Sequence, residues 1–121
     1  MYKPADPLFD VSVERVRATA VVRVIGELDI GTAPVLADVL RTLDRPCSQV
    51  VLDVSGLTFI DSSGLAVVVS EHGRGASDGF DFVVAGATET VLEVLRLTGL
   101  DSRLPLAQDV EIALGEGTAV R

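Results

Sequence analysis

The run of residues 49–54 limits the fold more than any other feature of this sequence. Four of its six residues are Val or Leu, and three of these are adjacent. A strand that is apolar at neighbouring positions is typical of a parallel sheet that is covered on both faces. Because parallel strands need long crossover connections, which are usually helical, this run predicts an α/β fold.

Two strand patterns precede this run. Residues 8–14 alternate between apolar and polar side chains, and residues 19–25 are rich in β-branched side chains. Residues 15–18 form a connection short enough to join the two strands as a hairpin. An antiparallel hairpin beside parallel strands predicts a mixed, mostly parallel sheet.

A helix is predicted between the hairpin and residues 49–54. Thr32 is a good helix cap, and Pro34 suits the first turn. Apolar side chains then recur at helical spacing, and Asp44-Arg45-Pro46 predicts the end of the helix because the residue before a proline avoids helical dihedral angles.

The stretch after residue 54 is ambiguous in composition. Gly56 predicts a turn that ends the strand. Within residues 62–74 a valine run favours a strand, but the apolar side chains recur at helical spacing, and Ser62 or Ser63 could cap a helix. We therefore predict a helix that is broken at Gly73 and at the glycines that follow it.

The C-terminal part continues the alternation of strands and helices. We expect strands at residues 80–85 and 103–106 and helices at residues 88–98 and 109–114, with Gly99 as a left-handed cap. The whole order is β-β-α-β-α-β-α-β-α, which predicts a single α/β domain with helices packed on the sheet. Its expected bounds are residues 8–114, between a flexible lead-in at 1–7 and a flexible tail at 115–121.

The charge balance excludes some classes of partner. The net charge is −8, from 18 acidic and ten basic residues. Such a chain repels nucleic-acid phosphates and anionic lipid, so we expect neither partner. The sequence has no apolar run of about 20 residues and no secretion signal, from which we expect a cytoplasmic protein.

Metal and nucleophile sites have weak support. The acidic residues are scattered rather than spaced as in a cation-binding loop, and Cys47 is the single cysteine, so we expect no metal and no cofactor. Residues 75–79 match the G-x-S-x-G pattern of serine hydrolases, but they follow a predicted helix instead of a strand. The single histidine, His72, precedes Ser77 instead of following it, and we expect it near a helix end. These features argue against an enzyme.

Residues 61–63 carry the most informative polar side chains. Asp61, Ser62 and Ser63 stand where a strand and a loop run into a helix. Backbone N–H groups are free at a helix N-terminus, and the helix dipole favours negative charge there. A serine at this place can be an ordinary helix cap, or it can accept a phosphate without unfolding the domain. Residue types alone leave both readings open.

Three segments together resemble one known family. Residues 61–65 (Asp-Ser-Ser-Gly-Leu), residues 26–29 (Gly-Glu-Leu-Asp) and residues 95–100 (Leu-Arg-Leu-Thr-Gly-Leu) resemble, in order and spacing, elements of the STAS-domain anti-sigma factor antagonists. The resemblance extends over about residues 8–114 and implies that family's α/β fold.

The resemblance also implies a function. Members of the family bind an anti-sigma factor that is also a serine kinase, and this binding releases a sigma factor. Phosphorylation, which here maps to Ser62, ends the binding, and a serine phosphatase reverses it. The implied partner-binding residues are Asp29, Asp61, Ser62, Ser63, Gly64 and Leu65, in a monomer or weak dimer. STAS domains also serve as scaffolds or as small-ligand sensors, which is the alternative that the sequence leaves open.

Overall fold

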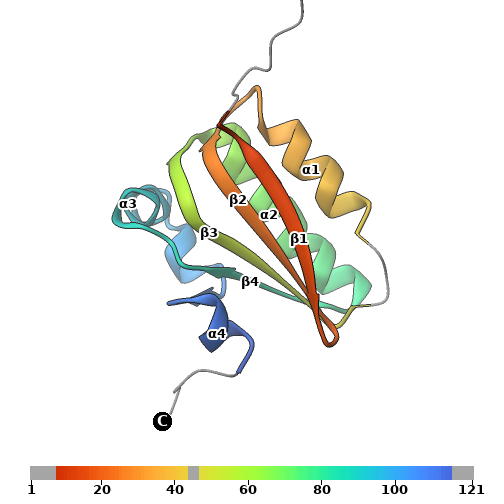
Figure 1. Ribbon diagram of the computed structural model, residues 1–121. Coiled ribbons are helices and arrows are strands. Elements are labelled where there is room, and N and C mark those ends of the chain that lie inside the picture. The colour runs from red at the N-terminus through yellow and green to blue at the C-terminus, as the bar shows by residue number, and fades with distance from the viewer. Residues whose placement is uncertain (1–7, 44–46, 116–121) are drawn as a thin grey trace, which may run out of the picture.

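The computed structural model describes residues 8–43 and 47–115, and these form one α/β domain (Figure 1). The predicted lead-in, the helix stop at residues 44–46 and nearly all of the predicted tail lie outside the described residues. The elements are β1 (Asp10–Val16), β2 (Thr19–Leu28), α1 (Ala33–Arg41), β3 (Gln49–Ile60), α2 (Ser62–Asp78), β4 (Asp81–Ala85), α3 (Glu89–Leu97), the 3₁₀ helix η1 (Leu100–Ser102), β5 (Leu106–Ala107) and α4 (Val110–Ala113).

The five strands form one sheet in the order β1-β2-β3-β4-β5. β1 pairs with β2 in antiparallel fashion, and all other pairs are parallel. The predicted mixed, mostly parallel sheet and the predicted order of elements are therefore confirmed. The hairpin turn is tighter than expected, because both strands extend to leave only Arg17 and Ala18 between them, with Arg17 at a φ of 55°.

Both faces of the sheet are covered, as the apolar run in β3 predicted. Val50, Leu52 and Val54 face the main core, to which α1, α2 and α3 contribute. Val51 faces a smaller cluster with Val21, on which α4 packs. In Figure 1, α1 and α2 lie side by side behind the sheet, whereas α4 lies on the near side. The half-buried Cys47 packs against the main core.

The prediction of a turn at Gly56 was wrong. β3 continues through Gly56 to Ile60, with irregular register against β2 around this point. A Cβ at Gly56 would lie 2.9 Å from Ile25 Cγ1 and 3.2 Å from Val24 O. Glycine is therefore needed here because two strands approach closely, and not because the chain turns.

The predicted break at Gly73 was also wrong. α2 runs to Asp78, so Gly73 and Gly75 lie inside it, and only Gly79 forms the left-handed C-cap, at a φ of 87°. His72 accordingly lies six residues before the last residue of α2, instead of at its end. The last strand was placed too early: residues 103–105 precede β5.

Candidate functional site

The candidate site is the sheet edge where β2 and β3 end. Leu28 and Ile60 are register partners at the last rung between the two parallel strands. The next residue of each strand is Asp29 or Asp61, and the Asp61 N–H donates to Leu28 O at 3.2 Å. Parallel pairing therefore brings together two aspartates that lie 32 residues apart in the sequence.

Asp61 is the N-cap of α2, where Ser62 or Ser63 was predicted. Its Oδ1 accepts hydrogen bonds from Ser63 N at 2.9 Å and from Gly64 N at 3.3 Å. A carboxylate at this position accepts hydrogen bonds from two of the free N–H groups of the first turn. Its negative charge is also stabilised by the positive end of the helix dipole. The cap prediction was off by one residue, because Asp and Ser are similarly good caps.

Ser62 is the first residue of α2, and its side chain is exposed. Neither its hydroxyl nor that of Ser63 makes a hydrogen bond within the described residues, and Ser63 is less exposed than Ser62. Since Asp61 already supplies the cap, the Ser62 hydroxyl has no structural task in this fold. It is free to meet another molecule.

Gly64 and Leu65 lie beneath this surface. A Cβ at Gly64 would lie 2.7 Å from Leu28 Cγ and 2.9 Å from Ile60 Cγ1, so the first turn of α2 packs directly on the two strand ends. The atoms that approach Gly64 this closely belong to side chains and not to the backbone. Leu65 is buried in the main core. Both residues hold the helix start that carries Ser62.

Asp29 shapes the loop before α1. Its Oδ1 accepts hydrogen bonds from Gly31 N at 3.0 Å and from Thr32 N at 3.1 Å. The buried Thr32 hydroxyl donates to Glu27 O at 2.7 Å and accepts from Asp29 N at 2.9 Å. Thr32 therefore precedes α1 as predicted, but its hydroxyl stabilises the loop and does not cap the helix.

Exposed apolar side chains flank this edge, and the sequence analysis missed them. Ile30, which follows Asp29, is 79% exposed, and Phe59 of β3 is 43% exposed. A hollow of about 500 Å³ opens beside Asp29, lined in part by Ile25 and Thr58. An apolar residue in a polar loop, as Ile30 is, was the available signal. Such exposed apolar surface at a rim of polar groups is typical of interaction sites.

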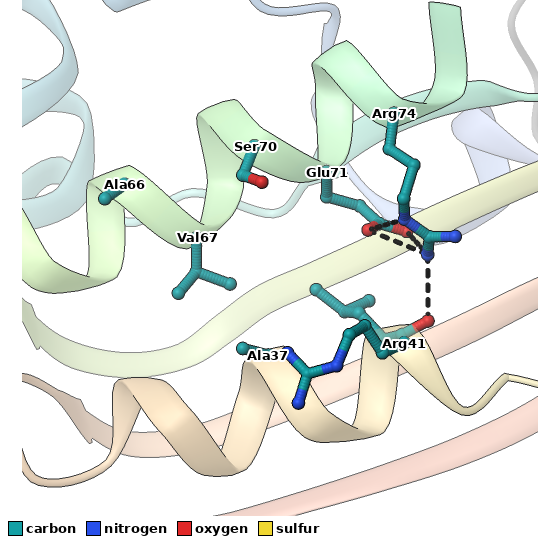
Figure 2. A pocket seen from close by; sticks show the side chains of 8 residues that line it. Ala37, Arg41, Ala66, Val67, Ser70, Glu71 and Arg74 are labelled. Carbon is teal, nitrogen blue, oxygen red and sulfur yellow. Dashed lines mark hydrogen bonds and ion pairs between the residues drawn. The ribbon is translucent and has the colours of Figure 1, made fainter. Parts of the chain in front are cut away.

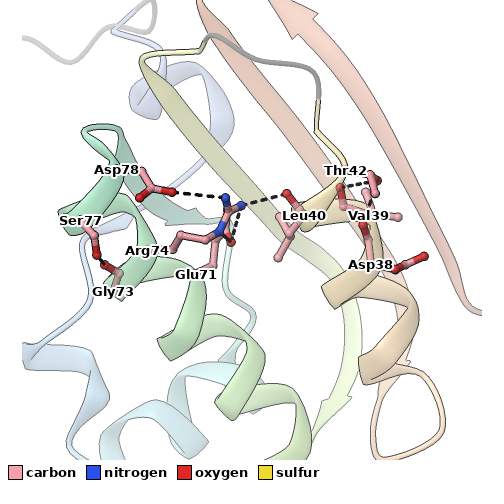
Figure 3. Close-up of polar contacts among 9 residues, drawn as sticks. All are labelled: Asp38, Val39, Leu40, Thr42, Glu71, Gly73, Arg74, Ser77 and Asp78. Carbon is pink, nitrogen blue, oxygen red and sulfur yellow. Dashed lines mark hydrogen bonds and ion pairs between the residues drawn. The ribbon is translucent and has the colours of Figure 1, made fainter.

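The flank of α2 carries a second concave region, between α1 and α2 (Figure 2). It has a volume of about 300 Å³ and is lined mainly by small or apolar side chains. At its end, Glu71 is only 4% exposed and is paired with Arg74, whose Nη2 lies 3.0 Å from Glu71 Oε1. The same nitrogen donates to Leu40 O at 3.0 Å (Figure 3). This contact ties α2 to the last turn of α1.

Charges elsewhere on the sheet are paired in a separate network. Arg23 Nη1 lies 2.7 Å from Glu14 Oε1, and Arg23 Nε lies 3.3 Å from Asp53 Oδ2. The hydrogen bond to Glu14 is the main reason why the pKa of Arg23 is raised above its ordinary value. This network lies on the sheet face that is opposite to α1 and α2.

Two other kinds of site, a hydrolase nucleophile and a metal centre, have sequence features to compare with the structure. The Gly75–Gly79 pentapeptide forms the last turn of α2 and its cap, where the Ser77 hydroxyl donates to Gly73 O at 3.1 Å. This is not a turn from strand to helix, which a hydrolase nucleophile requires. Within the described ranges, no group of three or more His, Cys, Asp or Glu side chains could hold a metal ion. The described helices include none that is long and apolar enough to cross a membrane.

Known proteins share this architecture and sequence pattern. The chain is 30% identical, over 112 residues, to an anti-sigma F factor antagonist from Paenibacillus polymyxa, covering 88% of this chain and 92% of that protein. The crystal structure of an anti-sigma factor antagonist from Mycobacterium paratuberculosis superposes with a TM-score of 0.80 at 28% identity, covering 88% of this chain and 92% of the other. A crystal structure of a protein from Thermotoga maritima gives a TM-score of 0.81 at 25% identity over the same shares. The STAS domain model matches residues 10–113, and the chain belongs to the STAS domain family.

Proposed function

We propose that this chain is an anti-sigma factor antagonist. In its unphosphorylated form it binds an anti-sigma factor that is also a serine kinase, and this binding releases a sigma factor. Phosphorylation of Ser62 by that kinase ends the binding, and a serine phosphatase restores it. The chain itself acts by binding and catalyses no reaction, and its cytoplasmic location remains a prediction.

The observation that carries the proposal is the state of Ser62. It is exposed, its hydroxyl makes no hydrogen bond among the described residues, and it stands at the first position of α2. Two relatives named as anti-sigma factor antagonists align with most of the chain. Exposed apolar side chains beside the serine give a partner surface to bury, and Asp29 and Asp61 provide acceptors at its centre.

The expected switch is electrostatic. A phosphate adds about −1.5 to −2 charge at neutral pH. Here it would join Asp29 and Asp61 at one sheet edge, so a partner that matches the unmodified surface would have to desolvate an unpaired dianion. A loss of about 3 kcal/mol weakens an affinity more than a hundredfold, which is enough for a switch without refolding.

The first experiment is to incubate the chain with a candidate anti-sigma kinase and ATP and to locate the phosphate by mass spectrometry. We expect modification of wild type and of Ser63→Ala, and none of Ser62→Ala. Absence of phosphate with every candidate kinase, together with a large homo-oligomer in light scattering, would favour the scaffold alternative.

The second experiment compares partner affinities by calorimetry. Ser62→Asp should bind the anti-sigma factor far more weakly than Ser62→Ala. Ser77→Asp is the matched control, since it adds the same charge at the exposed far end of the same helix. Equal affinities of Ser62→Ala and Ser62→Asp would refute the placement of Ser62 within the interface.

A further inference from the structure

Arg103 differs from the other arginines that the structure describes. Arg23, Arg41, Arg74 and Arg96 each form an ion pair, and the rest have a partner of some kind. Within residues 8–43 and 47–115, the guanidinium of Arg103 makes no hydrogen bond and no ion pair, in a chain with 18 acidic and ten basic residues. An unpaired arginine on an acidic chain is an available site for an anion.

The position of Arg103 is fixed by the backbone around it. Its N–H donates to Leu100 O at 3.0 Å, and the next N–H, that of Leu104, donates to the same oxygen at 2.9 Å. The Leu104 side chain is buried in the main core. The segment after η1 is thereby anchored, and Arg103 projects from a fixed stretch of chain.

Arg103 lines a pocket against the middle of α2. The pocket has a volume of about 320 Å³, and its lining consists of Val69, His72, Leu100, Arg103 and Leu104. Three of these side chains are apolar, two carry nitrogen donors, and none is a carboxylate. Binding pockets for small molecules have this makeup, and their volumes start at about 300 Å³.

His72 supplies the second donor. Its half-buried ring lies against Phe82, with the ring centroids 6.4 Å apart and an angle of 49° between the ring planes. The ring nitrogens make no hydrogen bond among the described residues, and none of the polar side-chain atoms that are fully buried there lacks a partner. The imidazole nitrogens therefore stay accessible to a ligand.

We propose that this pocket binds an amphipathic monocarboxylate, a carboxylate joined to a short alkyl or aryl group. The guanidinium fork of Arg103 matches the two oxygens of a carboxylate, and an N–H of His72 can donate to one of them. Val69, Leu100 and Leu104 cover the apolar part. A bare phosphate would leave the apolar wall unused and would find only two side chains with donors.

This pocket is separate from the switch at Ser62. Val69 lies seven residues after Ser62, two turns along the same helix, which is about 10 Å. The ligand site therefore does not depend on the proposed phosphorylation, and its test needs no kinase and no anti-sigma factor.

The test is a titration of the full chain with octanoate, followed by calorimetry and by backbone amide shifts in NMR. We expect saturable binding with shifts at residues 69–72 and 100–104. The probes 1-octanol, which lacks the charge, and acetate, which lacks the tail, should bind at least about tenfold more weakly. Arg103→Gln should lose at least about tenfold in octanoate affinity, and Arg96→Gln, which removes an exposed and ion-paired arginine of α3, should lose none.

Four results would overturn the proposal. These are the absence of octanoate binding up to about 10 mM, shifts confined to other parts of the chain, equal binding of 1-octanol, and equal affinity of Arg103→Gln and wild type. Because Arg103 is exposed and unpaired, its substitution is expected to leave the fold intact, and the melting temperature of each variant checks this.

Discussion

Alanine substitutions at Gly73 and Gly75 should change the stability of the chain in opposite directions. The two glycines lie two residues apart in the same helix, α2. A Cβ at Gly73 would meet nothing within 4 Å, whereas a Cβ at Gly75 would lie 2.6 Å from Phe80 O and 3.1 Å from Phe80 Cε1. The same chemical change is therefore made once in open space and once against a backbone carbonyl.

The magnitudes follow from helix propensity and packing. Alanine is favoured over glycine inside a helix by about 0.8–1 kcal/mol, which Gly73→Ala should gain in full. Gly75→Ala gains the same amount but forces the Phe80 carbonyl away, at an overpacking cost of about 1–3 kcal/mol. The displaced segment includes the Phe80 N–H, which donates to Gly75 O at 3.0 Å, so this end cap is weakened too.

Thermal unfolding followed by circular dichroism measures both effects. For a chain of this length, 1 kcal/mol corresponds to about 3–5 °C in melting temperature. We expect Gly73→Ala to raise the melting temperature by about that amount and Gly75→Ala to lower it. A Gly75→Ala variant as stable as wild type would refute the argument that close contact selected glycine there. A destabilised Gly73→Ala variant would refute the helical placement of Gly73.

Three further predictions concern single polar contacts. Asp61→Ala should cost about 1–2 kcal/mol in urea unfolding because it removes the α2 cap, whereas Asp61→Asn should keep most of the stability; equal loss in both would contradict the capping role. Arg74→Met should cost up to about 3–5 kcal/mol because it removes the guanidinium that is ion-paired with the buried Glu71 carboxylate. The double variant with Glu71→Met should recover most of that loss, and a single variant as stable as wild type would show that the ion pair with Arg74 adds nothing to the net stability. Thr32→Val should cost about 1–3 kcal/mol and Thr32→Ser much less, since only the hydroxyl bridges Glu27 O and Asp29 N; similar losses would assign the effect to the methyl group instead.

The apolar pattern of the sequence was sufficient to predict the sheet. The run in β3 predicted a strand covered on both faces, and the alternation of strands and helices predicted the order of elements, because burial is encoded by residue type and period. The errors concentrate at glycines. Gly56 and Gly73 were interpreted as breaks from their local preference, but the first serves a close approach between strands and the second is tolerated inside a long helix.

The sequence predicted which residues form the candidate site better than it predicted how their side chains are bonded. Asp29 and Asp61 were singled out from separate segments, and parallel pairing brings them to one edge. Their hydrogen bonds could not be predicted, because Asp, Ser and Thr compete for the same backbone N–H groups at a helix start. The lack of a partner at Arg103 is a tertiary property, and no local pattern signals it.

The geometry determines which substitutions can separate binding from folding at this edge. Asp29 orders the loop before α1, Asp61 caps α2, and Gly64 admits the packing of Leu28, so substitutions at these three positions alter the structure as well as the surface. A loss of partner affinity in such variants would therefore have two explanations. The Ser62 hydroxyl makes no hydrogen bond within the described part of the chain, so Ser62→Ala removes a reactive group without removing a contact. A change in binding or phosphorylation in Ser62→Ala can accordingly be assigned to the interface itself.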